Sequence, residues 1–424
     1  MNIARQAAKP AKKARAYFFA SFAPSRDKLF VSWLFTLAVL LSCPLRADTV
    51  LVLPFANHSA AANLDWIGES IAETVRDALA SQGLLVLDRE ERLEAYRRLS
   101  LRPGAELTRA SAIKIGQSLD ASMVIYGEYD QQPTGGAKEA SKGSLRITGR
   151  VLDLKRIRQS SPFIQSGALE ELPGMEVQLG WEALRQIEPA TPLSKEDFAF
   201  LHPAVRLDAM ESYVRGLLAA TPEQSHRFFT QAARLDEMFS QPCFHLARQA
   251  WEQKDYKSAA AWFQRVSRGD SHYLQAQFFL GLCRYYGGDA AAAAQSFQLV
   301  AEAVPLNEVY NDLGAAQVRC NDLAAAVAAF RKAIEGDDAD PDYRFNLGYA
   351  LWRSKDFEGA AESLRAAVER DPSDGEASAL LERATRQDGP RPGDPRSEGR
   401  QRLKTNFEEF AYRQLQAELA AGKK

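Results

Sequence analysis

The spacing of apolar and polar residues changes character part-way along the chain. Between residues 49 and 190, short apolar runs alternate with segments in which apolar residues recur about every four positions. Strands are predicted at 49–55, 84–87, 122–129 and 144–154, with a Gly- and Lys-rich hairpin turn at 134–143. Helices are predicted at 64–81, at 89–99, from 108 onward, and at 175–187. This order predicts an α/β sandwich of about 140 residues.

Beyond Pro203 the chain is helical and repeats itself. Small residues recur at intervals of 34, 33 and 34 positions, at Ala247, Gly281, Gly314 and Gly348. Sixteen positions after each comes a large apolar residue, at Phe263, Phe297, Phe330 and Leu364. Small residues let two antiparallel helices approach, and the large residue fills the space between them. The pattern resembles the tetratricopeptide repeat, which implies an all-α solenoid with a degenerate first repeat at 208–239 and a capping helix at 376–386.

Such an array has a concave surface lined by the first helix of each pair. On these helices, aromatic residues seven positions apart point the same way. The predicted partner-binding groove consists of Phe244, Trp251, Phe278, Tyr285, Phe345, Tyr349 and Trp352, with Asn311 and Val318 at the equivalent places of the third repeat. Aromatic clusters are enriched at protein interfaces, although the same rings would also serve to pack neighbouring helices. The Lys/Asn set that grips a C-terminal carboxylate in chaperone-binding relatives is missing, which disfavours that ligand.

The amino-terminal residues have the properties of an export signal. Residues 1–47 carry eight Lys/Arg and one acid, followed from Asp48 by a body of net charge about −9. The uncharged apolar run at 29–43 is short for a bilayer span but suits a signal-peptide core, and Ala47 predicts cleavage before Asp48. An uncleaved membrane anchor and a start codon placed too far upstream are the alternatives. Cys43 ends a lipobox-like Leu-Leu-Ser-Cys, so it is either a lipidation site or an inert apolar cysteine.

The rest of the sequence offers little chemistry. Because the chain after residue 47 is acidic, we expect no basic surface that would bind the phosphate backbone of a nucleic acid. Cys243, Cys283 and Cys320 are widely spaced without paired Cys or His, so we expect small buried helical residues, not a zinc site or disulfide. Asp65, Glu69 and Glu73 recur every four positions, which predicts a solvated acidic helix face more than a metal or acid–base site. His58 is expected as a surface turn residue, with a general base as the alternative. Phosphate loops, nucleophile elbows and zinc-protease motifs do not occur, so we predict no catalytic residue, cofactor or metal.

Four blocks of the first unit occur in a recognisable order. They are Val-Leu-Pro-Phe-Ala-Asn at 52–57, the segment 64–73, Leu-Asp-Arg at 87–89 and Leu-Asp-Ala at 119–121. Together they resemble the amino-terminal domain of the TolB, FlgO and CsgG group, over about residues 49–160. That resemblance implies work in the periplasm or at the outer membrane. The chain lacks the β-propeller of TolB and the long membrane hairpins of a CsgG-type pore.

These observations predict four parts. They are a signal peptide at 1–47, an α/β domain at 48–190, tetratricopeptide repeats with a capping helix at 191–388, and a linker with an amphipathic helix at 389–424. We expect a non-enzymatic scaffold, in the periplasm or at the outer membrane, that binds protein or peptide partners. Membrane attachment through Cys43 or the leader stays open. The alternatives are a subunit of a secretion or surface-assembly complex and an enzyme with an unrecognised α/β site. The sequence does not decide whether the last helix caps the array or fills its groove.

Overall fold

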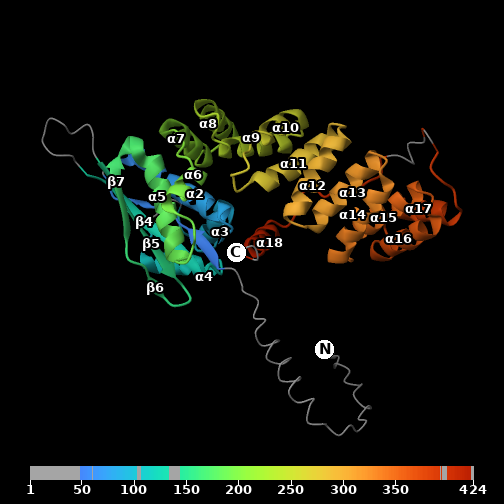
Figure 1. The fold of residues 1–424 in the computed structure, drawn as a ribbon, viewed down its shortest axis with the longest axis horizontal. Coiled ribbons are helices and arrows are strands. Elements are labelled where there is room, and N and C mark those ends of the chain that lie inside the picture. The colour runs from blue at the N-terminus through green and yellow to red at the C-terminus, as the bar shows by residue number, and fades with distance from the viewer. Residues whose placement is uncertain are drawn as a thin grey trace, which may run out of the picture. The chain divides into compact units, whose positions relative to one another are not determined.

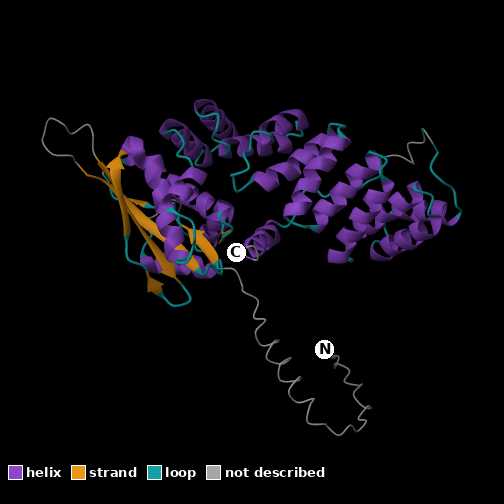
Figure 2. Cartoon of the chain, viewed as in Figure 1, coloured by secondary structure: helices purple, strands orange, loops and turns teal. Residues whose placement is uncertain are grey.

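The computed structural model describes residues 48–59, 61–102, 107–132, 144–391, 393 and 399–421 (Figure 1). The predicted leader with Cys43 and the predicted hairpin turn lie outside these residues. Within the described chain, no helix has both the length and the apolar character needed to cross a membrane. The described residues form one compact unit, which combines a mixed sheet with a helical solenoid (Figure 2).

The first part is built on a seven-stranded mixed sheet. β1 (Thr49–Val52) runs parallel to β3 (Leu85–Val86) on one side and to β4 (Met123–Gln132) on the other. β4 pairs antiparallel with β5 (Ser144–Asp153), and β5 pairs antiparallel with β6 (Arg158–Gln159) and β7 (Phe163–Ala168). The short β2 (Ala56–Asn57) continues alongside β4. The sheet therefore combines a parallel half and an antiparallel half, and β3 lies at its edge.

Helices cover both faces of this sheet because successive strand residues point to opposite sides. Val50 and Val52 face α2 (Trp66–Ser81) and α5 (Leu172–Ile187), in one apolar cluster. Leu51 and Leu53 face α3 (Arg89–Arg98) and α4 (Arg109–Ser118), in a second cluster. Asp88 and Thr108 cap α3 and α4 by accepting hydrogen bonds from backbone N–H groups three residues on. The 3-10 turn Ala62–Leu64 precedes α2, so the helix begins at Trp66, two residues later than the sequence had indicated.

The second part is a solenoid of antiparallel helix pairs, joined to the first by α6 (Lys195–Leu201). The pairs are α7 (Leu207–Leu217) with α8 (Pro222–Leu235), α9 (Gln241–Glu252) with α10 (Tyr256–Phe263), α11 (Tyr273–Tyr286) with α12 (Ala290–Ala303), α13 (Asn307–Arg319) with α14 (Leu323–Gly336), and α15 (Pro341–Arg353) with α16 (Phe357–Arg370). α17 (Gly375–Thr385) packs on α16, and α18 (Glu409–Ala421) follows later in the chain.

The small and large residues of each pair meet as the repeat pattern predicts. A Cβ atom added to Gly314 would lie 2.7 Å from a ring carbon of Phe330, and one added to Gly281 would lie 2.7 Å from the ring of Phe297. Real Cβ contacts are essentially never this close, so only glycine fits at these crossings. The sequence had therefore placed the repeat register correctly.

A second device fixes the turn between the helices of a pair. Aspartates at 255, 289, 322 and 356 cap the second helix by accepting a hydrogen bond from a backbone N–H three residues on. Each follows a residue with positive φ: Lys254, Gly288, Asn321 and Lys355. The left-handed residue ends the first helix and the aspartate begins the second, so each turn is short and similar.

Two expectations for individual side chains are wrong. Glu69 and Glu73 are buried, not on a solvated face: Glu69 forms ion pairs with Arg89 and Arg92 that join α2 to α3, and Glu73 pairs with Arg76 within α2. Cys320 is exposed, and it is the C-cap residue at which α13 ends. Cys243 and Cys283 are buried as expected, and burial raises the pKa of the Cys243 thiol to about 11.

Candidate functional site

The groove side of the solenoid holds a segment of the same chain, residues 400–407, which is neither helix nor strand and bends at Thr405. Asn346 Oδ1 accepts the Arg402 N–H at 2.9 Å, and Asn346 Nδ2 donates to the Arg402 carbonyl at 2.7 Å. Asn311 Nδ2 also donates to that carbonyl, at 2.8 Å. Asp312 Oδ1 accepts the Lys404 N–H at 2.8 Å. Side chains on α13 and α15 therefore hold this backbone in the way that a neighbouring β-strand would.

The three groove residues that hold the backbone are themselves fully buried. Asn311, Asp312 and Asn346 each have 0% of their surface exposed, and Asn346 Nδ2 also donates to Asn311 Oδ1 at 2.8 Å. A buried polar side chain costs free energy unless its hydrogen bonds are made, and here the peptide backbone makes several of them. Burial raises the pKa of Asp312 well above its usual range, although the Lys404 N–H partly offsets this effect.

The two basic side chains of the segment enter an acidic pocket. Arg402 Nη1 lies 2.6 Å from Asp374 and 3.2 Å from Asp342, and its guanidinium carbon lies 3.6 Å from the centre of the Phe345 ring. Lys404 Nζ lies 2.7 Å from Asp340 and 2.8 Å from Asp342. These acids occupy the first turns of α15 and α17, or their caps, where the helix dipole favours negative charge.

The pocket shifts the ionisation of its members in a consistent direction. Burial alone would raise the pKa of Asp374, but the hydrogen bond and charge of Arg402 hold it below its usual value. Burial alone would lower the pKa of Lys404, but its hydrogen bonds to Asp340 and Asp342 raise it. Each partner therefore favours the charged form of the other, which is typical of a matched ion-pair network.

Past the groove, the segment continues onto the first part of the protein. Phe407 packs edge-on against Phe278 with ring centres 5.0 Å apart. On α18, Arg413 donates to the Val86 carbonyl of β3 at 3.0 Å and pairs with Glu91 at 2.9 Å. The last helix thus lies at the edge strand of the sheet, while the extended residues before it lie in the groove. The helix itself neither caps α17 nor fills the groove.

The aromatic residues predicted to form the groove have different surroundings. Three of them contact the bound segment: Tyr285 donates to Gln401 at 3.3 Å, Phe278 packs on Phe407, and Phe345 lies beneath Arg402. The remaining four have other neighbours: Trp352 donates to the Asp388 carbonyl, Tyr349 stacks on Phe345, Phe244 stacks on His272, and Trp251 packs on Phe279. Their role in binding a partner stays a prediction.

The residues that hold the backbone were largely missed by the sequence. Asn311 was placed on the groove face, but Asp312, Asn346 and the acids of the pocket were not singled out. One signal was present: Asp312 and Asn346 occupy equivalent places in successive first helices, 34 positions apart and two positions before Gly314 and Gly348. Apolar periodicity does not reveal such a pair, because both polar side chains lie where a buried apolar residue would also fit.

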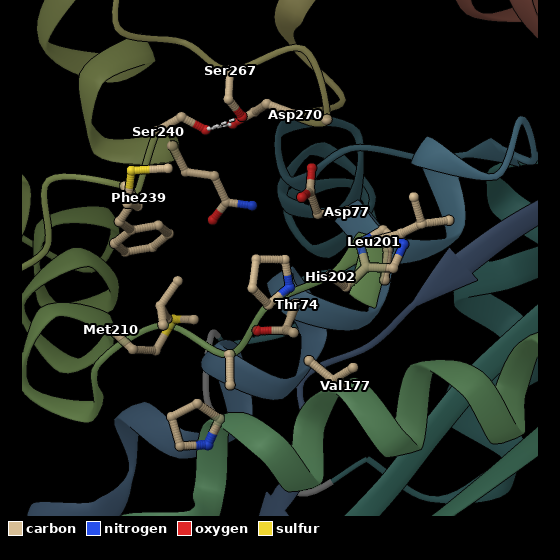
Figure 3. Close-up of a pocket in the computed structure, with 18 residues that line it drawn as sticks. Thr74, Asp77, Val177, Leu201, His202, Met210, Phe239, Ser240, Ser267 and Asp270 are labelled. Carbon is tan, nitrogen blue, oxygen red and sulfur yellow. Dashed lines mark hydrogen bonds between the residues drawn. The ribbon is translucent and has the colours of Figure 1, made fainter. Parts of the chain in front are cut away.

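A second concavity lies where the α/β part meets the start of the solenoid (Figure 3). It offers about 140 Å³ of space, and its lining mixes Thr74, Asp77, His202, Ser240 and Asp270 with apolar side chains. Ser240 donates to Asp270, as the dashed line in Figure 3 marks. Burial lowers the pKa of His202 to about 4, so this imidazole is neutral at pH 7.

Most of the polar groups at this junction bond within the solenoid, where Asp270 accepts hydrogen bonds from Ser240 and from His272 Nδ1. Asp77 of α2 accepts one from Ser271, which joins the two parts. The ligand atoms of Asp77, Asp270 and His272 lie within 4.8 Å of one another, close enough for a cation, but serine hydroxyls already occupy both carboxylates. In a nucleophilic triad the imidazole lies between hydroxyl and carboxylate. Here the carboxylate lies between, so among the described residues the Ser240 hydroxyl is hydrogen-bonded to Asp270 and not to an imidazole.

Comparison with known proteins identifies the repeats. The tetratricopeptide-repeat family profile matches residues 244–308 and 311–375, which are therefore tetratricopeptide repeats. Among solved structures, YrrB, described as a TPR protein with an unusual peptide-binding site, is 19% identical over 37% of this chain and 82% of its own, with a TM-score of 0.34. MamA from Desulfovibrio magneticus RS-1 is 23% identical over 39% of this chain and 95% of its own, with a TM-score of 0.35. Scores this low carry no argument about function. A comparison with curated proteins gave no match.

Proposed function

We propose that this protein is a non-enzymatic scaffold of the bacterial cell envelope that binds partner proteins through the groove of its tetratricopeptide array. The observation that carries the proposal is the extended segment 401–404, whose backbone is held by Asn311, Asp312 and Asn346. Backbone hydrogen bonds depend little on side chains, so the same three residues would hold an extended segment of another protein.

The envelope assignment rests on the sequence. The basic leader with its apolar run at 29–43 supports export, and the blocks that resemble the TolB, FlgO and CsgG group support a periplasmic or outer-membrane site. In this proposal the α/β part contacts one component of the envelope while the repeats contact another. Intact-mass measurement of the protein from envelope fractions tests export, because cleavage before Asp48 leaves a defined mass. Retention of residues 1–47 in a cytoplasmic fraction would count against it.

The binding role is tested by removing the backbone contacts. Asn346→Asp keeps the side-chain size but replaces the donor Nδ2 with an acceptor, so it should abolish cross-linking of partners to the groove in living cells. Asn63→Ala, on an exposed asparagine of the α/β part, is the matched control and should leave cross-linking unchanged. If both variants fold and cross-link equally well, the groove is not the binding site.

A further inference from the structure

The groove is strongly acidic where residues 400–404 lie. Asp340, Asp342, Asp374 and Glu376 come together from the starts of α15 and α17, and each lies within 4.0 Å of a basic side chain of the segment. Without those cations, four carboxylates would repel one another across a partly buried pocket. The acids are therefore complementary to a cationic ligand, and stability of the bare array does not account for them.

The geometry also fixes the spacing of the ligand's charges. In an extended chain, residues two apart point to the same side, and their backbone groups face the same edge. Arg402 and Lys404 are such a pair: both side chains reach Asp342, and both backbone N–H groups are held by the groove. The two subsites differ, because the Arg402 guanidinium lies over the Phe345 ring and pairs with two carboxylates, an arrangement that suits arginine more than lysine.

A third contact extends this pattern. Phe407, three positions after Lys404, packs on Phe278 of α11. This helix belongs to the repeat that precedes α13 in the chain. The groove therefore offers subsites for an arginine, a basic residue two positions on, and an aromatic residue three positions beyond that. Leu403, between the two basic residues, is partly buried and packs against the apolar core, as Phe407 does.

We infer that the groove selects extended segments of partner proteins that carry arginine and lysine two positions apart, and that residues 400–407 are a resident copy of this ligand which the partner must displace. This inference rests on the proposed function, and it adds the chemistry of the ligand and the existence of an internal competitor. The segment is tethered at both ends, by the chain after α17 and by α18. Its effective concentration is then on the order of 1 mM, so it competes strongly with a free peptide.

A fluorescent peptide with the sequence of residues 399–408 serves as the probe, against the full chain. Arg402→Ala with Lys404→Ala should weaken the resident segment and tighten probe binding by at least about tenfold. The control is Arg97→Ala with Arg98→Ala, an equal loss of charge at two exposed arginines whose ion pairs lie within α3. Two further measurements use this Arg402→Ala, Lys404→Ala chain, in which the groove is freed. A probe with alanine at its Arg402 and Lys404 positions should bind it at least about tenfold more weakly than the basic probe. The basic probe should lose at least about tenfold in affinity when the chain also carries Asp342→Asn with Asp374→Asn.

The outcomes separate the two proposals. If the alanine probe binds the freed chain as tightly as the basic probe, and Asn346→Asp abolishes both, then the groove binds peptides but does not select basic ones, and the inference is wrong. If neither probe binds, the peptide-binding function fails with it. If the unaltered chain sediments as a dimer that Arg402→Ala with Lys404→Ala converts to monomers, the ligand is the tail of a second copy, which overturns a separate partner. A rise of ionic strength should weaken the basic probe but not the alanine probe.

Discussion

Substituting alanine for two helical glycines tests how tightly the repeats are packed. At Gly314 an added Cβ would lie 2.7, 2.8 and 2.9 Å from three atoms of the Phe330 ring, and that ring is fully buried. At Gly174, near the start of α5, an added Cβ meets no atom within 4 Å. Both substitutions gain up to about 1 kcal/mol from the better helix propensity of alanine, so the difference between them isolates the packing at Gly314.

Overpacking a core position costs about 1–3 kcal/mol, so after the propensity gain we expect Gly314→Ala to lower the free energy of unfolding by up to about 2 kcal/mol. Gly174→Ala should raise it by up to about 1 kcal/mol. Urea unfolding followed by circular dichroism measures both. The double variant Gly314→Ala with Phe330→Leu should recover part of the loss, since the smaller side chain leaves room for the methyl group. Equal shifts for the two alanine variants would refute the close crossing.

Two further substitutions test the first part of the protein and its contact with α18. Glu176 is fully buried on α5, and burial raises its pKa to about 7 from 4.5, so the folded state binds a proton that the unfolded chain releases. Stability should therefore fall by about 3 kcal/mol between pH 4.5 and 7 relative to Glu176→Gln, measured by denaturant unfolding, whereas the exposed Glu170→Gln should show no such difference. Arg413→Ala removes the bonds to Val86 and Glu91, so backbone hydrogen exchange of residues 409–421 should speed up. Gln414→Ala, at an exposed position of the same helix, is the control. No change with Arg413→Ala, or an equal change with the control, would show that Arg413 does not anchor α18.

The repeats were predictable because the same pattern of small and large residues recurs several times in the sequence. Gly281 and Gly314 face Phe297 and Phe330 in the structure as the spacing predicted, since one set of helix contacts recurs in each pair. The first strands and helices of the α/β part were also found, because their apolar runs are buried. β7 was missed for the opposite reason. Only Phe163 of its six residues is buried, so no apolar run or clean alternation marks it.

The groove's chemistry was less accessible because it depends on contacts between distant parts of the chain. Arg402 and Asn346 are 56 positions apart, and nothing in their local sequence links them. From the sequence, the amphipathic helix was the part of the C-terminal segment that was expected to cap the array or fill its groove. In the structure the groove is occupied by the extended residues just before that helix, which have no periodic pattern to detect.

The two halves of the C-terminal segment differ in the forces that hold them. On α18, Tyr412 and Ala417 are buried, and removing apolar surface from water stabilises the docked helix. This stabilisation does not depend on a specific hydrogen-bonding group that a competing peptide could supply. Residues 400–404 are held mostly by hydrogen bonds and ion pairs, which largely replace bonds to water and contribute only about 0.5–1.5 kcal/mol each. Another peptide with the same groups would make the same contacts, so exchange in the groove leaves the groove's buried asparagines satisfied. A segment held in this way is retained near the groove by its helix while its extended part remains replaceable.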